Sequence, residues 1–193
     1  MVYDRDGLVF AQSIDRDRAF ELIRDAEKLG EQTDIMVCGT RHAYCKDKSG
    51  EMYQWLTEGY GFDLVAVEDL TKIQDEFVKI SIYHKNRVEE ITDQWFRPKW
   101  EGSAKLTLAG IQWLDCVPQS AGKRSAVTFI QEKLKIMPEE TVIFGDNQND
   151  IEMFERAGVS YAVENARDEV KRAAHHICGP FYKNGVLEVL RSL

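Results

Sequence analysis

Residues 141–154 read TVIFGDNQNDIEMF, and this stretch places a polar loop between a short apolar strand and a helix. The strand is expected to end in Gly145-Asp146, and the helix to begin at about Asn149-Asp150. Asp146 then lies at the carboxyl end of a strand, and Asn149 near a helix N-terminus, where backbone amides favour an anion. Mg²⁺ usually binds one or two carboxylates together with water and substrate phosphate. The stretch therefore predicts a site for a metal and a phosphate, although Asp and Asn are equally suited to ordinary turns and helix caps.

The segment before this strand adds a positive charge. Residues 121–136, AGKRSAVTFIQEKLKI, are expected to form a helix with Lys123 at its start. An ammonium group there can neutralise phosphoryl oxygens. A lone lysine at a helix start is ordinarily solvated and is disfavoured by the helix dipole. The combination of lysine, helix, apolar strand and GDxxND favours the functional interpretation.

The two halves of the chain differ in pattern, with a change near residues 115–122, and we place the domain boundary between residues 115 and 116. Residues 116–193 alternate strands and helices, which predicts a parallel sheet with helices on both faces. Residues 1–115 contain the alternating strand FVKISIYH and a helix over 86–100 that is expected to stop at Pro98. This half is predicted to be an α+β module with an antiparallel sheet and helices on one side. The chain is thus expected to have two domains.

Composition narrows the classes of partner. The formal net charge is −8, so we expect neither nucleic acid nor an anionic membrane as a partner, because both need a basic surface. No apolar run approaches the roughly 18–20 residues of a membrane span, and we expect a cytoplasmic protein with a small-molecule partner. The cysteines, Cys38, Cys45, Cys116 and Cys178, form no CxxC pair. They are expected to be reduced thiols rather than a disulfide framework or a zinc site.

These motifs together resemble the haloacid dehalogenase-like (HAD) superfamily, and within it the Cof-type phosphatases with a class IIB cap. Residues 121–136 are similar to the third motif of that family, and VIFGDNQNDIEMFERAGVSYAVENA (142–166) to the fourth motif and the strand after it. DEVKRAAHHICGPFYKNGVLEVL (168–190) is similar to its C-terminal end. The resemblance implies an α/β fold: a partial HAD-like Rossmannoid core, with a parallel sheet and helices on both faces, plus an α+β cap with an antiparallel sheet.

The resemblance also implies a function, that of a Mg²⁺-dependent phosphatase of small phosphorylated metabolites such as sugar phosphates. In that family an aspartate attacks phosphorus, and a second aspartate two residues later protonates the leaving oxygen. By this likeness Lys123 would contact the phosphate and Asp146 would bind Mg²⁺. Asn149 would help to position the phosphoryl group, while Asp150 would support the metal loop from behind and Asn165 would line it.

The stretch DRDG at residues 4–7 has two interpretations. Asp4 and Asp6 are either the two catalytic aspartates or the turn of the hairpin with which the cap begins. The hairpin is favoured, because only three residues precede Asp4 and Leu8 stands where the family motif has threonine. We then expect a truncated chain that lacks the first and second motifs and is inactive alone, with a homodimer or another chain completing the sheet. The alternatives are a non-catalytic phosphate- or metal-binding or assembly protein, and a complete compact phosphatase that uses Asp4 and Asp6.

Substrate choice in capped enzymes of this kind is expected to come from side chains of the cap. Arg41, His42 and Tyr44, in the polar run after a predicted strand, are the candidates for specificity.

Overall fold

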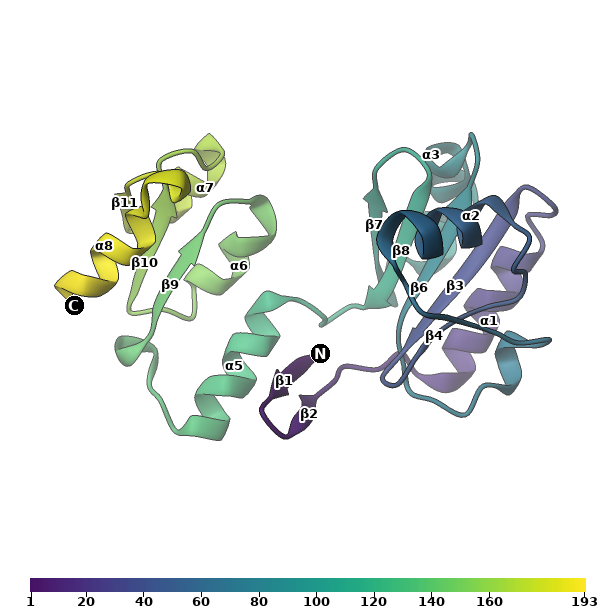
Figure 1. Cartoon of the computed structure of the whole chain (residues 1–193), viewed down its shortest axis with the longest axis horizontal. Coiled ribbons are helices and arrows are strands. Elements are labelled where there is room, and N and C mark those ends of the chain that lie inside the picture. The colour runs from purple at the N-terminus through teal and green to yellow at the C-terminus, as the bar shows by residue number, and fades with distance from the viewer. The chain divides into compact units, whose positions relative to one another are not determined.

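The computed structural model describes all 193 residues and divides the chain into two compact units, Met1–Ala121 and Gly122–Leu193 (Figure 1). The boundary expected from the sequence, between residues 115 and 116, falls inside strand β8 (Trp113–Pro118). The whole of that strand belongs to the first unit, because it pairs along its length with β7 (Ala104–Ala109). None of the helices has the length and apolar character of a membrane span.

The elements of each unit follow in chain order. The first unit contains β1 (Val2–Asp4), β2 (Gly7–Phe10), α1 (Arg16–Glu27), β3 (Thr33–Gly39), β4 (Ala43–Cys45), α2 (Glu51–Gln54), β5 (Leu64–Ala66), β6 (Phe77–His84), α3 (Val88–Ile91), α4 (Arg97–Trp100), β7 and β8. The second contains α5 (Lys123–Leu134), β9 (Val142–Gly145), α6 (Ile151–Phe154), β10 (Val159–Val163), α7 (Asp168–Ala173), β11 (His176–Cys178) and α8 (Gly185–Ser192).

The first unit is built on a six-stranded sheet in the order β5-β4-β3-β6-β8-β7. Every neighbouring pair is antiparallel except β4 and β5, which run parallel. The central strand β6 places Ile80 opposite both Val37 of β3 and Cys116 of β8. The predicted antiparallel character therefore holds for the body of the sheet, and the parallel pair lies at one edge.

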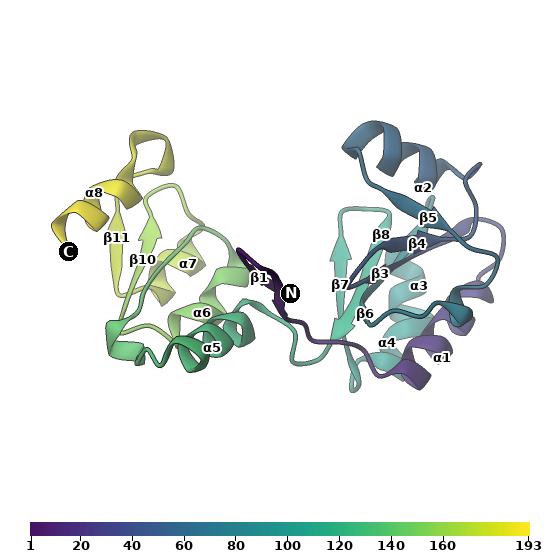
Figure 2. The same ribbon diagram turned by 60° about the horizontal axis from the view of Figure 1, so that its bottom comes forward.

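Helical segments cover both faces of this sheet (Figure 2). Because side chains alternate along a strand, Ile80 and Ile82 of β6 point to one face, where they pack in a cluster with residues of α1, α3 and α4. Tyr83 points to the other face, where it clusters with Met52 of α2 and with Leu56 of the π-helical segment Trp55–Gly59 that follows α2. The sequence predicted helices on one side, and α2 on the second face is a difference. Cys116 is buried in the first cluster and Cys45 in the second.

Helix α1 begins as its sequence predicts. Asp15 is the N-cap residue, and its Oδ1 accepts a hydrogen bond from the backbone N–H of Arg18 over 3.1 Å. Capping by an aspartate satisfies one of the N–H groups that a helix start leaves free. The buried side chains Ala19, Leu22 and Ile23 then face the sheet.

The helix expected to stop at Pro98 continues through it. A π-helical segment, Thr92–Phe96, joins α3 to α4, and Pro98 lies in the first turn of α4. Proline breaks a helix interior because it lacks an N–H, but the first turn of a helix has no intrahelical partner for that group. The expected stop is therefore wrong. The helical path continues to Trp100, because the π-helical turn Thr92–Phe96 ends just before Pro98 and the proline lies in the first turn of α4, where it is tolerated.

The second unit has a parallel three-stranded sheet in the order β11-β10-β9, as the alternation of strands and helices predicted. Its buried cluster joins Ile143, Phe154, Ala162 and Val170 from strands and helices, with Val186 of α8 packed against it. The same cluster contains Cys178. The carboxyl end of β9, where the polar loop begins, lies at the edge strand of this sheet.

Candidate active site

The loop after β9 is shaped by a close approach of α6 to the strand. A Cβ atom on Gly145 would lie 2.6 Å from the Cβ of Asp150 and 2.9 Å from Cζ of Phe154. Glycine therefore allows the short turn 148–150 to fold back over the strand end. Asn147 precedes this turn, and its Oδ1 accepts a hydrogen bond from the N–H of Gln148 over 2.9 Å.

Asp150 holds the site together. Its side chain is buried, and Oδ1 accepts a hydrogen bond from Nζ of Lys123. Oδ2 accepts from the backbone N–H of Asp146 at 3.0 Å and of Asn147 at 3.1 Å. Burial alone would raise the pKa of Asp150, but the hydrogen bonds from Lys123 and from the two amides outweigh it and hold that pKa below its ordinary value. One ionised carboxylate thus joins the lysine to the loop.

A second carboxylate fixes the start of α5. Oε1 of Glu152, from α6, accepts a hydrogen bond from the backbone N–H of Lys123 over 2.7 Å. A Cβ atom on Gly122 would lie 2.3 Å from the same oxygen, so the residue before Lys123 must leave room for it. A carboxylate at a helix N-terminus is favourable electrostatically. The sequence reasoning did not identify Glu152, and a single glutamate in a helix carries no signal of such a contact.

The side chains of Asp146 and Asn149 are exposed at this loop. No group of three or more His, Cys, Asp or Glu side chains in the chain is arranged to hold a metal ion. Both oxygens of Asp150 already accept hydrogen bonds, so Asp146 is the carboxylate that the loop offers. One carboxylate fits Mg²⁺, which commonly keeps several waters and binds phosphate oxygens. The donor set is therefore compatible with Mg²⁺ but does not form a complete cage.

Asn165 has another contact. Its Oδ1 accepts a hydrogen bond from the N–H of Phe181 over 3.1 Å, which fixes the turn ahead of α8. The β10–α7 segment meets the polar loop through the backbone instead, because the N–H of Arg167 donates to the carbonyl of Asp146 at 3.4 Å.

Asp4 and Asp6 belong to the first unit, in the hairpin β1–β2. Asp4 pairs with Gly7, and Oδ1 of Asp4 accepts a hydrogen bond from the N–H of Asp6 over 2.9 Å. Gly7 has φ of +127°, a conformation that suits glycine at a hairpin turn. The hairpin predicted here is present, but it forms a two-stranded sheet of its own and adds no strand to the six-stranded sheet.

The three cap candidates surround one buried carboxylate, Asp75. Oδ2 of Asp75 accepts hydrogen bonds from the N–H of Arg41 at 3.1 Å and of His42 at 3.4 Å, and from the hydroxyl of Tyr44 at 3.0 Å. Thr40 donates to Oδ1 through its hydroxyl at 2.7 Å. These bonds outweigh the effect of burial and hold the pKa of Asp75 well below its ordinary value. The structure thus brings Arg41, His42 and Tyr44 together around a residue that the sequence reasoning missed.

The fold and site define an α/β protein with a Lys–Asp pair at the carboxyl end of a parallel strand and a separate α+β unit. The sequence model of the haloacid dehalogenase-like hydrolase family matches residues 1–190, and the chain belongs to this family. The membership that the motifs indicated is confirmed, and so is the HAD-like fold.

Similar proteins of known sequence and structure agree with this. The chain is 29% identical over 162 residues to the 5-amino-6-(5-phospho-D-ribitylamino)uracil phosphatase YbjI of Escherichia coli, a match to 82% of this chain and 59% of that protein. A solved structure from Eubacterium rectale has a TM-score of 0.88 and 35% identity, covering 93% of this chain and 68% of the other. A solved HAD subclass IIB sugar phosphatase, BT4131, shares the fold with a TM-score of 0.71 at 17% identity, over 97% of this chain and 70% of its own. The chain thus spans less than two thirds of the length of the curated relative.

Proposed function

We propose that the chain acts in the hydrolysis of small phosphate esters with Mg²⁺, that Lys123 at the start of α5 supplies a positive charge, and that the loop after β9 supplies the metal ligand Asp146. The observation that supports this most directly is the bridge through Asp150, which ties the ammonium group of Lys123 to the backbone amides of Asp146 and Asn147. A lysine tied through Asp150 to a loop with an exposed carboxylate offers two of the parts that phosphoryl transfer uses, a positive charge and a metal ligand.

Each residue has a distinct role in this proposal. The Nζ of Lys123 neutralises charge on the phosphoryl oxygens, and Asp150 keeps that group in position. Asp146 binds Mg²⁺, and the side-chain amide of Asn149 donates a hydrogen bond to a phosphoryl oxygen. Bound Mg²⁺ would add positive charge where negative charge develops in the transition state.

The names of two similar proteins support a proposal for the substrate class. The E. coli protein is named for a ribityl phosphate compound, and a solved relative is described as a sugar phosphatase. We propose a small substrate in which the phosphate is esterified to a hydroxylated carbon skeleton.

A direct assay tests the proposal. Release of inorganic phosphate from an aryl phosphate is measured with and without Mg²⁺ for the wild-type chain, Asp146→Asn and Lys123→Met. Asp168→Asn is the matched control, because Asp168 is an exposed aspartate of the same unit. Any hydrolysis by the wild-type chain is expected to depend on Mg²⁺, to be lost in both site variants and to be retained in the control. Hydrolysis that is unchanged in the site variants would refute the assigned roles.

The same assay decides about Asp4. Loss of hydrolysis in Asp4→Asn would identify Asp4 as the nucleophile and favour a complete compact phosphatase. The alternative function is non-catalytic binding of phosphate or metal. The N–H of Asp6 donates a hydrogen bond to Oδ1 of Asp4, and this structural role of Asp4 in the turn favours the alternative over catalysis by Asp4. Binding of inorganic phosphate, measured by calorimetry with Mg²⁺ present and without any hydrolysis, would support this alternative.

A further inference from the structure

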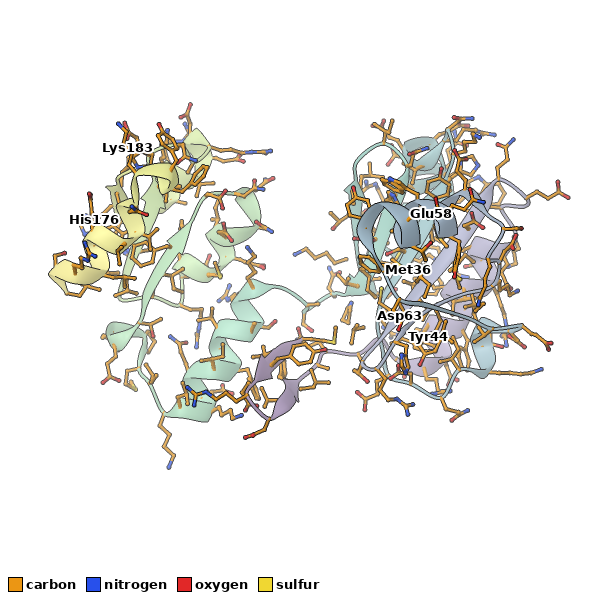
Figure 3. The ribbon with its side chains drawn as sticks, viewed as in Figure 1. Met36, Tyr44, Glu58, Asp63, His176 and Lys183 are labelled. Atoms are coloured by element: carbon orange, nitrogen blue, oxygen red, sulfur yellow. The ribbon has the colours of Figure 1, made fainter.

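The second face of the six-stranded sheet contains a cavity of about 380 Å³. Its walls include Trp55 and Tyr60, from the helical segment after α2, and Trp113 of β8. In Figure 3, Met36 marks the sheet behind this region and Glu58 marks the helical segment in front of it. The volume lies within the range of sites that bind small organic molecules.

The floor of the cavity is polar and electrically balanced. Lys79 and Ser81 of β6 both contact Asp115 of β8: Nζ of Lys79 lies 3.1 Å from Oδ2, and the hydroxyl of Ser81 donates to Oδ1 over 2.6 Å. A lysine ammonium group has three donors and a carboxylate has further lone pairs, so the partly exposed side chains of Lys79 and Asp115 can still bond a ligand, while the buried Ser81 orients Asp115. Asp115 would repel an anionic ligand, and Lys79 would repel a cationic one. The floor therefore favours an uncharged ligand with adjacent groups that both donate and accept hydrogen bonds.

The aromatic walls favour a non-planar ligand. The rings of Trp55 and Trp113 pack on one another, with centroids 5.8 Å apart and planes tilted by 31°, so no slot between them accepts a flat ring. Tyr60 meets Trp55 edge to face at 5.4 Å. Trp55 and Tyr60 are nevertheless 41% and 64% exposed. Half-exposed aromatic faces beside a polar floor can stack against the C–H groups of a sugar or a sugar alcohol.

The backbone at the mouth is unusual as well. Trp55–Gly59 form a π-helical segment, a conformation that occurs frequently at functional sites. Gly61 follows with φ of +65°, which turns the chain so that Phe62 also lines the cavity. Several large apolar side chains are thus clustered at one place on the surface. A single exposed apolar residue is common on protein surfaces, but such a cluster is typical of a binding site.

We propose that this cavity is a binding site for an uncharged, polyhydroxylated carbon skeleton, which stacks on Trp55 and forms hydrogen bonds with Lys79 and Asp115. The proposal goes beyond the phosphatase function and does not require it. Its test uses ligands without phosphate, so that failure of hydrolysis and failure of this site are separate results.

The test is a calorimetric titration of the full chain with ribitol, glucose and uracil, supported by tryptophan fluorescence. We expect both polyols to bind and uracil not to bind. Trp55→Ala should weaken the binding about tenfold, and so should Lys79→Met, which removes the ammonium group from the floor. Trp95→Ala is the control, because Trp95 is 65% exposed and does not line the cavity, and it should leave the binding unchanged.

Two results would overturn the proposal. The first is the absence of any heat or fluorescence change with either polyol, or a response that Trp55→Ala leaves intact. The second is binding of uracil alone, which would make the cavity a site for a planar heterocycle. Since Lys79 is bonded to Asp115, circular dichroism of Lys79→Met verifies its fold, and Trp55→Ala, at an exposed position, keeps the test decisive if that variant fails to fold.

Discussion

Two buried carboxylates, one in each unit, organise the loops in which the candidate functional residues lie. Asp150 and Asp75 are 3% and 7% exposed. Each accepts hydrogen bonds from backbone N–H groups of a neighbouring loop as well as from side chains. A buried ionised group is tolerated when such bonds replace its hydration. The exposed candidates, Lys123 and Arg41, are therefore held in position by residues that do not themselves face solvent.

The contrast between Asp150 and Asp146 can be measured. Asp150→Asn should lower the free energy of unfolding by about 1–3 kcal/mol, because the substitution places an amide NH₂ against donors that lose their acceptor. Asp146→Asn should change it by less than about 0.5 kcal/mol, since that side chain is exposed. Urea denaturation of the two variants beside wild type provides the comparison. Equal effects of the two substitutions would contradict the bridging role of Asp150.

Asp75 should make stability depend on pH in acid. Its folded-state pKa lies below the ordinary value of 3.8. A carboxyl group with a depressed pKa stabilises the folded state fully above its unfolded-state pKa, and that contribution is lost as pH falls toward the folded-state value. The difference in unfolding free energy between wild type and Asp75→Asn should therefore be about 3 kcal/mol near neutral pH and should shrink below about pH 4. Thermal denaturation over a pH series tests this, and a difference that stays constant down to about pH 2 would contradict it.

The sequence predicts part of the site, for physical reasons. Lys123, Asp146 and Asp150 occur in a strand–loop–helix pattern that local spacing reveals, and the structure brings Lys123 and Asp150 into contact. Asp75 and Glu152 follow from no local pattern. Their partners lie many residues away, and the contacts exist only after β3, β4 and α6 have packed.

At the scale of elements, the regular patterns were the predictable ones. The capped start of α1 and the parallel strands of the second unit follow from capping chemistry and from apolar runs. The π-helical segments Trp55–Gly59 and Thr92–Phe96 do not, because one extra residue per turn hardly alters a helical pattern of hydrophobic residues. The parallel pairing of β4 and β5 could not be predicted either, since strands of only three residues show no clear pattern in the sequence.

The docking of α8 against β11 depends on a glycine contact. A Cβ atom on Gly185 would lie 1.9 Å from the carbonyl oxygen of Gly179, and backbone cannot move aside as a side chain can. Gly185→Ala should therefore destabilise the second unit by about 1–3 kcal/mol. Gly102→Ala is the matched control, because nothing lies within 4 Å of a Cβ at that position. Thermal melts of the two variants should differ clearly, and similar melts would argue against this packing.

At the scale of the whole molecule, each buried cluster of apolar side chains lies within one of the two units of the chain. Two clusters belong to the first unit, on the two faces of its sheet, and one belongs to the second. Since each unit has its own core, each can lose its structure with its own free energy.

Hydrogen exchange should show this division. Asp75→Asn should reduce amide protection within residues 1–121, and Gly185→Ala within residues 122–193, each leaving the other unit's protection unchanged. Mass spectrometry of peptides from the exchanged chain measures both at once. Loss of protection throughout the chain from either substitution would mean that the units unfold together.

The placement of the cysteines makes the chain a reporter of its own opening. Each buried cluster contains one buried thiol: Cys116 and Cys45 on opposite sides of the sheet, and Cys178 in the second unit, while the half-buried Cys38 packs against the cluster of Cys45. Burial raises the pKa of all three, that of Cys116 to about 12, so the folded thiols are scarcely ionised at neutral pH. An alkylating reagent therefore modifies each thiol only when the residues around it open. Peptide mapping of the order of modification then shows which buried cluster opens first.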